Sequence, residues 1–202
     1  MHRHRLTRQE SRNQTRKRLL DAAAEVITSK GLASTSVQDI AVHAGYTRGA
    51  FYSNYASKLD LFGKLLEEDH ARFKDRLRQL LDSTFRQKEE CIPPPVARHE
   101  GLANAMLWVE ARHHALHDMA FREHLNALML SLLDVVAVTL DECFTRLGIA
   151  PSIPTSALAL ATLALVDGSI YFDIDRSVDG PSSALRANLD TLFMAAIADK
   201  RT

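Results

Sequence analysis

The sequence predicts an all-α protein with a small N-terminal helical domain and a larger C-terminal helical domain. Apolar residues recur at intervals of three and four along most of the chain, which is the period of amphipathic helices. Glycines and prolines gather between these segments and supply the stops. With 46% hydrophobic and 25% charged residues, the composition is that of a packed domain rather than a disordered chain.

Charge is distributed unevenly along the 202 residues, although the formal net charge is zero. Residues 1–58 hold ten Lys and Arg against four Asp and Glu, a net charge of +6, and the remaining residues carry −6. Such a split suggests that the first segment meets a polyanion. The expected organisation is a basic N-terminal arm at 1–13, a helix-turn-helix domain at 14–60 and a larger helical domain at 61–202.

The two cysteines, Cys91 and Cys143, are too few for a disulfide framework that would stabilise a fold of this length. Nothing at the N-terminus resembles the apolar core of a signal peptide. We therefore expect a cytoplasmic protein, with any redox role of the two thiols left open. The longest apolar run, 157–166, is far shorter than the ~20 residues of a membrane span. No membrane partner is expected.

The first helix is expected over 14–30, where apolar residues recur at helical spacing until Gly31. The arginines before it fit either a minor-groove arm or a frayed tail that attracts DNA without specificity. These arginines are Arg3, Arg5, Arg8 and Arg12.

Two short helices follow, and a tight turn joins them. Thr35 or Ser36 can cap the first, with Gln38 or Asp39 completing a capping box in either register, and Gly45 ends it. Thr47 is a cap candidate for the second, expected over 48–54. Two such helices around a glycine turn make a helix-turn-helix.

The second of these helices would present a mixed polar side to the major groove of DNA. Arg48 in its first turn could reach guanine O6 and N7, and Gly49 would allow a close backbone approach. Tyr52 and Lys58 are placed to contact phosphates, which fix register without reading sequence. Tyr52 could instead be a core aromatic residue.

The run from Thr15 to Glu67 resembles the DNA-binding domain of the TetR/AcrR family of bacterial transcriptional regulators. The matching residues include Gly31, Thr35, the segments Asp39-Ile40-Ala41 and Ala44-Gly45, and Gly49-x-Phe51-Tyr52, with Tyr55-x-Ser57-Lys58-x-x-Leu61 beyond them. The resemblance implies DNA contact by Thr47, Arg48, Gly49, Tyr52, Ser53, Asn54 and Lys58, flanked by Thr35 and Gln38.

The rest of the chain predicts five further helices. The first, with Ser57 as N-cap, is expected to run to about residue 86, and Pro93, Pro94 and Pro95 then mark a linker. The others are expected over 102–117, 121–147, 155–173 and 183–199.

The last two of these helices carry apolar stripes, which a homodimer would bury. The resemblance implies a four-helix bundle between two subunits, with the recognition helices one DNA turn apart. The stripe residues are Leu158, Leu163, Val166, Ile170, Leu185, Leu189, Leu192, Phe193 and Ile197.

The resemblance also implies a cavity for a small-molecule effector, although methionines and aromatics at helical spacing are more often core residues. The candidate pocket residues are Met106, Trp108, Met119, Phe121, Met129, Tyr171 and Phe172. Glu110, His113 and His117 share a helix face that could hold a metal ion, but no further paired ligand lies nearby in the sequence, and we expect neither a metal nor another cofactor.

The sequence therefore predicts a homodimeric repressor that binds a palindromic operator in double-stranded DNA and is released by a small molecule. An activator or a ligand-independent DNA binder remains an alternative. A metal-dependent enzyme built on Glu110, His113 and His117 is the rival from another class. The sequence shows no nucleophile elbow, P-loop, dinucleotide fingerprint or paired-carboxylate geometry that would support it. We expect no enzymatic activity.

Overall fold

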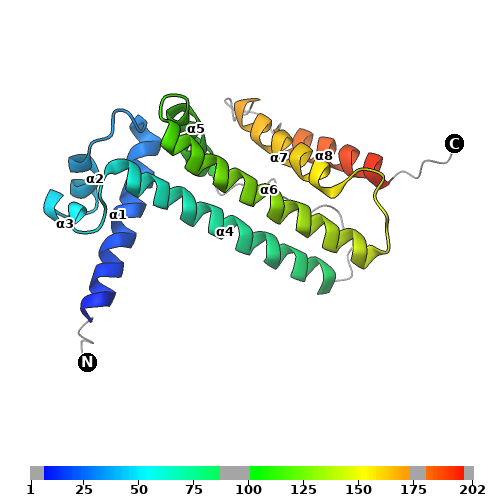
Figure 1. The fold of residues 1–202 in the computed structure, drawn as a ribbon, viewed down its shortest axis with the longest axis horizontal. Coiled ribbons are helices and arrows are strands. Elements are labelled where there is room, and N and C mark those ends of the chain that lie inside the picture. The colour runs from blue at the N-terminus through cyan, green and yellow to red at the C-terminus, as the bar shows by residue number, and fades with distance from the viewer. Residues whose placement is uncertain (1–6, 87–100, 173–180, 198–202) are drawn as a thin grey trace. The chain divides into compact units, whose positions relative to one another are not determined.

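The computed structural model describes residues 7–86, 101–172 and 181–197, and these form eight α-helices and no strand (Figure 1). The all-α prediction is confirmed. The predicted proline linker at 91–96 lies outside the described residues. The helices are α1 (Arg8–Lys30), α2 (Val37–His43), α3 (Arg48–Tyr52), α4 (Lys58–Arg86), α5 (Gly101–Ala115), α6 (Met119–Leu147), α7 (Thr155–Phe172) and α8 (Pro181–Ile197).

The helices group into two compact units that differ from the predicted domains. Of the described residues, unit 1 comprises 7–69 and 101–125, and unit 2 comprises 70–86, 126–172 and 181–197. Unit 1 therefore contains α5 and the first turns of α6 in addition to the helix-turn-helix segment. The helices α4 and α6 contribute residues to both units.

Most helix ends fall where the sequence predicts them. Gly31, Gly45 and Gly148 all adopt positive φ angles at the ends of α1, α2 and α6, a conformation that L side chains rarely adopt. The start of α1 was predicted too late. The hydroxyl of Thr7 accepts the amide of Glu10 while the Glu10 carboxylate accepts the amide of Thr7, a capping box that starts the helix within the predicted arm.

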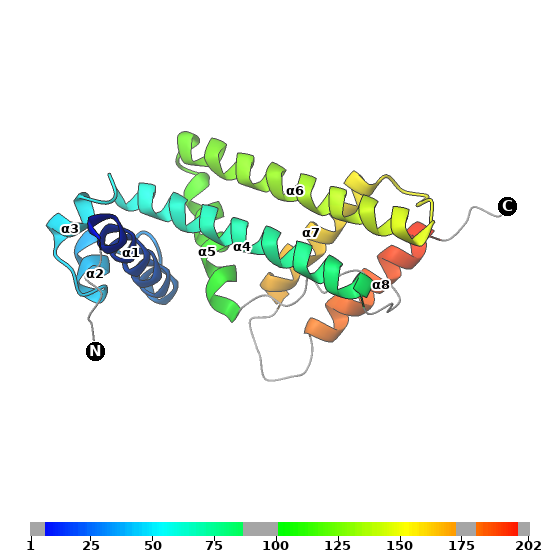
Figure 2. The same ribbon diagram turned by 90° about the horizontal axis from the view of Figure 1, so that it is seen from below.

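The core of unit 1 forms where α1 packs against α2 and α5, and α2 against α3. In Figure 2, α1 is seen nearly along its axis with the two short helices beside it. The side chains of Leu19, Ile27, Ile40, Phe51 and Leu61 are completely buried there. The first turns of α1 are exposed, because they carry polar side chains only.

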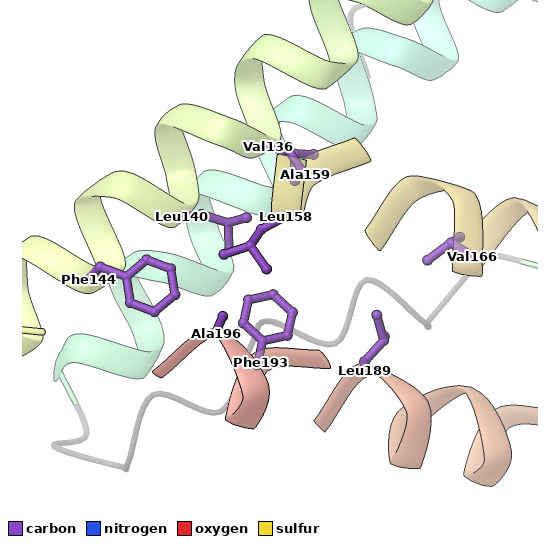
Figure 3. Packing of buried hydrophobic residues seen from close by; sticks show 9 residues of the cluster. All are labelled: Val136, Leu140, Phe144, Leu158, Ala159, Val166, Leu189, Phe193 and Ala196. Atoms are coloured by element: carbon purple, nitrogen blue, oxygen red, sulfur yellow. The ribbon is translucent and has the colours of Figure 1, made fainter. Parts of the chain in front are cut away.

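The core of unit 2 uses residues that the sequence analysis assigned to a dimer interface. Leu158 and Val166 of α7 pack with Leu189 and Phe193 of α8 in one buried cluster, together with residues of α6 (Figure 3). Leu163, Leu192 and Ile197 are partly buried against the same cluster. These residues of the predicted stripes are therefore buried or partly buried in the core of a single chain. Ile170 and Leu185 lie outside the residues whose side chains are described.

Two apolar residues off these stripes are exposed instead. Leu160 of α7 retains 61% of its accessible surface and Met194 of α8 retains 64%. Neither residue belongs to a predicted stripe. Because α7 is apolar around most of its circumference, its sequence is compatible with several stripes.

The predicted pocket residues do not share one environment. Phe121 is buried and stacks on Phe62 of α4, with ring centroids 5.7 Å apart, so it is a core residue of unit 1. Met119 is 70% exposed, whereas Met106 and Met129 are half-buried. The side chains of Tyr171 and Phe172 lie outside the described part.

Trp108, the remaining pocket candidate, makes a defined polar contact. Its indole Nε1 donates a hydrogen bond to the carboxylate of Asp69 on α4, 2.7 Å away. The carboxylate is buried, so the bond helps to tie α5 to α4 within unit 1. Among the helices that the structure describes, none has the length and apolar character needed to cross a bilayer.

Candidate nucleic-acid interface

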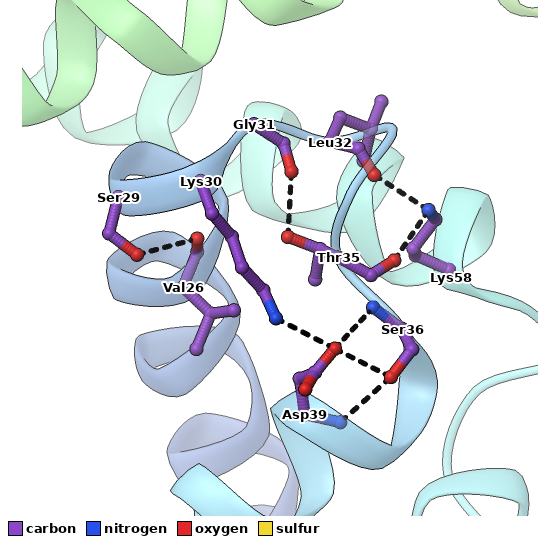
Figure 4. Close-up of polar contacts among 9 residues, drawn as sticks. All are labelled: Val26, Ser29, Lys30, Gly31, Leu32, Thr35, Ser36, Asp39 and Lys58. Carbon is purple, nitrogen blue, oxygen red and sulfur yellow. Dashed lines mark hydrogen bonds and ion pairs between the residues drawn. The ribbon is translucent and has the colours of Figure 1, made fainter.

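The start of α2 is fixed by a capping box in one of the two predicted registers. The Ser36 hydroxyl accepts the amide of Asp39, and the Asp39 carboxylate accepts the amide and hydroxyl of Ser36 (Figure 4). Lys30 of α1 reaches the same carboxylate at 2.8 Å. Lys30 and then Ser36 hold the pKa of Asp39 well below its usual value. The two helices are thus linked through one carboxylate.

The turn between α2 and α3 is tight because Gly45 adopts a φ of 74°. The amide of Tyr46 donates to the carbonyl of Ala41, 2.8 Å away, and this bond closes the turn. Thr47 then caps α3 by accepting the amide of Ala50 at 3.2 Å. The predicted helix-turn-helix is therefore present, with α3 as its second helix.

The side of α3 that faces the interior anchors the helix. Phe51 is completely buried, and Tyr55 beyond the helix is 2% exposed. Arg16 of α1 lies over the Tyr55 ring at 4.8 Å and donates to the carbonyl of Asn54, while the Tyr55 hydroxyl donates to the Arg16 carbonyl. Burial raises the pKa of Tyr55 to about 12. Arg16 was not among the predicted site residues, because nothing in its local sequence indicates a partner 38 residues away.

The opposite side of α3 is exposed and carries Arg48, Gly49, Tyr52 and Ser53. Tyr52 is 48% exposed, so it is not a core residue. The Arg48 guanidinium lies 5.5 Å from the centroid of the Tyr52 ring and donates to its hydroxyl at 3.4 Å. Thr47 and Gln38 are exposed as well. These side chains form a polar surface on a short, well-anchored helix.

The side chains of Ser53 and Asn54 form hydrogen bonds with carbonyl oxygens of α3. The Ser53 hydroxyl donates to the carbonyl of Gly49 at 2.9 Å, and the Asn54 amide donates to the carbonyl of Ala50 at 2.8 Å. Ser53 is exposed, whereas Asn54 is partly buried. The Ser53 hydroxyl can still accept a bond from a partner at the surface, whereas the Oδ1 of Asn54 is buried, so Ser53 is the more available of the two.

Thr35 differs from its predicted role as a flanking DNA contact. Its side chain is 2% exposed, and its hydroxyl donates to the carbonyl of Gly31 at 2.7 Å. The side chain therefore stabilises the loop between α1 and α2, Gly31–Thr35, and is not presented to a ligand at the surface.

Lys58, predicted as a phosphate contact, makes two hydrogen bonds within the chain. Its ammonium donates to the carbonyl oxygens of Leu32 and Thr35, at 2.6 and 2.7 Å (Figure 4). Burial lowers the pKa of Lys58. Two of its three protons are thus engaged within the chain, and Lys58 braces the loop Gly31–Thr35 from the start of α4.

The three candidate metal ligands on α5 and just beyond it do not converge. The Glu110 carboxylate accepts the amide of Leu32 at 2.8 Å. The rings of His113 and His117 contact each other edge to face, with centroids 5.8 Å apart. Within the part of the chain that the structure describes, no three His, Cys, Asp or Glu side chains are arranged to hold a metal ion.

Comparison with known proteins extends the similarity beyond the helix-turn-helix. Residues 19–65 match the family model of bacterial regulatory proteins of the tetR family. The regulator AcrR of Shigella flexneri is 43% identical over 63 residues, 31% of this chain and 29% of that protein. The repressor KstR2 of Mycobacterium tuberculosis is 34% identical over 103 residues, 51% of this chain and 48% of that protein. The chain thus matches less than half the length of these two relatives.

The fold of the whole chain is also found among solved structures. A TetR-family regulator from Rhodococcus covers 92% of this chain with a TM-score of 0.72 at 19% identity, and one from Mesorhizobium loti covers 96% with a TM-score of 0.74 at 16% identity. At these identities the likeness concerns the fold. Neither the family model nor the two relatives describe an enzyme. Residues 19–65 thus match the DNA-binding domain of the tetR family of bacterial regulatory proteins, and the described helices share the fold of TetR-family regulators.

Proposed function

We propose that the chain is a homodimeric repressor that reads a palindromic operator through α3. The supporting observation is the exposed face of α3, where Arg48 lies against the Tyr52 ring on a helix anchored by the buried Phe51. A five-residue helix can place only its first turn against base edges, and Arg48 is its first residue. Arg48 would read a guanine, and Tyr52 and Thr47 would contact phosphates.

Dimerisation is the second part of the proposal. The apolar residues that each chain leaves exposed on its last two helices, Leu160 and Met194, would meet their counterparts across a two-fold axis. Two copies related in this way would present their recognition helices about 35 Å apart, one turn of B-DNA. Leu160→Glu should shift sedimentation toward monomers at micromolar concentration, whereas the similarly exposed Leu116→Glu, on the α5–α6 turn of unit 1, should not.

Release by a small molecule is the third part. The ligand would favour a state whose recognition helices no longer match the operator. To move occupancy from nearly full to nearly empty, it must favour that state by about 5 kcal/mol. An activator, or a DNA binder without a ligand, would share the same α3 surface. A reporter joined to the upstream region of the gene, with and without the gene itself, separates repression from activation.

The DNA-binding proposal is tested by selecting duplexes from a random-sequence pool and measuring affinity by fluorescence anisotropy. Arg48→Ala should weaken binding to the selected duplex by about tenfold to a hundredfold and relax the preference at one position of each half-site. Arg78→Ala removes an arginine of unit 2 whose side chain is 68% exposed and serves as the matched control. Equal affinities for the parent and Arg48→Ala would contradict the assignment of α3.

A further inference from the structure

The loop Gly31–Thr35 sets where α2 begins. Its last residue precedes Ser36, the N-cap of α2, so any shift of the loop moves the start of the helix-turn-helix. Two bonds close the loop on itself: the Thr35 hydroxyl donates to the Gly31 carbonyl, and the Thr35 amide donates to the Leu32 carbonyl at 3.3 Å. These bonds leave the amide of Leu32 without a partner inside the loop.

Glu110 supplies that partner from a distant part of the sequence. Its carboxylate accepts the Leu32 amide at 2.8 Å, although the two residues are 78 positions apart. A bond between a backbone amide and a carboxylate is charge-assisted and stronger than one between neutral groups. Glu110 is half-buried on α5, which packs along α1 within unit 1.

Gly31 makes this approach possible for two reasons. Its φ of 81° is a conformation that other residues rarely adopt, and a Cβ at this position would lie 3.3 Å from a carboxylate oxygen of Glu110. That distance is tighter than ordinary van der Waals contact. The glycine therefore both ends α1 and leaves room for the carboxylate.

The loop is thus held from two sides by charged side chains of opposite sign. Lys58 of α4 binds its carbonyl oxygens, and Glu110 of α5 binds its amide. Two residues before Glu110, Trp108 ties α5 to Asp69 of α4. The bond from the Leu32 amide to Glu110 is 2.8 Å long, and a contact of about 3.6 Å is no longer a hydrogen bond, so a displacement of α5 by about 1 Å would break it.

We propose that Glu110 is a positioning residue for DNA recognition: through the Leu32 amide, the place of α5 sets the place of the helix-turn-helix. The inference rests on the proposed DNA-binding function. Glu110 does not touch DNA in this scheme, and it acts through the loop Gly31–Thr35. The bond links α5 to the start of α2.

The test compares Glu110→Ala, Glu110→Gln and the control Glu123→Ala, which removes an exposed carboxylate of unit 1. Affinity for the duplex selected by the parent is measured as a function of salt, at a temperature where all variants are folded. Glu110→Ala should weaken binding roughly tenfold. The slope of log affinity against log salt concentration should stay unchanged, because no phosphate contact is lost. Glu110→Gln keeps an acceptor oxygen and should recover most of the affinity. Glu123→Ala should match the parent.

Hydrogen exchange of the free protein provides a second measurement that needs no DNA. Glu110→Ala should increase the exchange rate of the Leu32 amide by about tenfold over that in Glu123→Ala. An unchanged Leu32 rate, or an affinity of Glu110→Ala within twofold of the parent, would overturn the proposal. If the parent selects no duplex, the DNA-binding function fails and with it the positioning role, while the exchange rate still shows separately whether Glu110 holds the loop.

Discussion

Replacing Lys58 by Met should destabilise the protein by about 2 kcal/mol. The two bonds from its ammonium to Leu32 and Thr35 are charge-assisted, and each such bond contributes about 1.5–3 kcal/mol. Burial of the ammonium, which lowers the pKa of Lys58, offsets part of this contribution. The Leu32 carbonyl also retains the Thr35 amide as a donor, so the main loss falls on the Thr35 carbonyl, at a cost of about 1–3 kcal/mol.

Urea denaturation followed by circular dichroism measures this effect. Met keeps the length and helix propensity of Lys, so the change isolates the ammonium. The control is Lys64→Met, which removes an exposed ion pair with Glu67 on the same helix, worth about 0–1 kcal/mol. For a chain of this length a loss of 2 kcal/mol corresponds to a fall in Tm of roughly 4–8 °C. Equal stabilities of the two variants would refute the bracing role of Lys58.

The same variant separates bracing from phosphate contact. If two protons of Lys58 stay within the chain and it makes no phosphate contact, the salt slope of binding to the selected duplex should match that of the parent. A slope smaller by about 0.9 would show that the third proton reaches a phosphate, as the sequence analysis predicted.

Three further outcomes are expected. Leu158→Ala should lower the free energy of unfolding by about 3–4 kcal/mol in urea denaturation, because Leu158 is completely buried, whereas Leu160→Ala should cost less than about 1 kcal/mol. The pKa of Tyr55 is raised from its ordinary 10.0 to about 12. The contribution of Tyr55 to stability is therefore complete below pH 10.0 and is lost as the pH rises through about 12. An ultraviolet absorbance titration should show a tyrosine that ionises at high pH, and Tyr55→Phe should remove this ionisation. The pKa of Asp39 is lowered from its ordinary 3.8, so the contribution of Asp39 to stability is present above pH 3.8 and is lost as the pH falls through the lower pKa of the folded state. Acid should therefore destabilise the parent protein more than the Asp39→Asn variant. Equal loss of stability in acid would contradict this.

Local signals in the sequence predicted most of the fold. Caps and glycines act on their neighbours, so Ser57, Gly31, Gly45 and Gly148 located helix ends correctly. The start of α1 was missed because its first turns are polar and carry no apolar period, although the Thr7 and Glu10 pair was a readable capping box.

The partners of charged side chains were the part that could not be predicted. Lys58 binds carbonyls 23 and 26 positions earlier, and Glu110 binds an amide 78 positions earlier. Such pairs depend on how helices pack, and periodicity does not reveal packing. For the same reason the stripes of α7 and α8 were assigned to a second subunit, whereas much of each stripe faces the other helices of its own chain.

The capping box at Thr7 has a consequence for how the molecule meets a polyanion. Arg8 and Arg12 lie about one turn apart on the helix α1, with a rise of about 6 Å between them, and do not belong to an irregular N-terminal segment. Their backbone has already lost its freedom on folding, so contact with a phosphate backbone would carry little additional entropic cost. Shortening the chain past Glu10 would unwind this end, whereas a tag placed ahead of Thr7 would leave the pair in register.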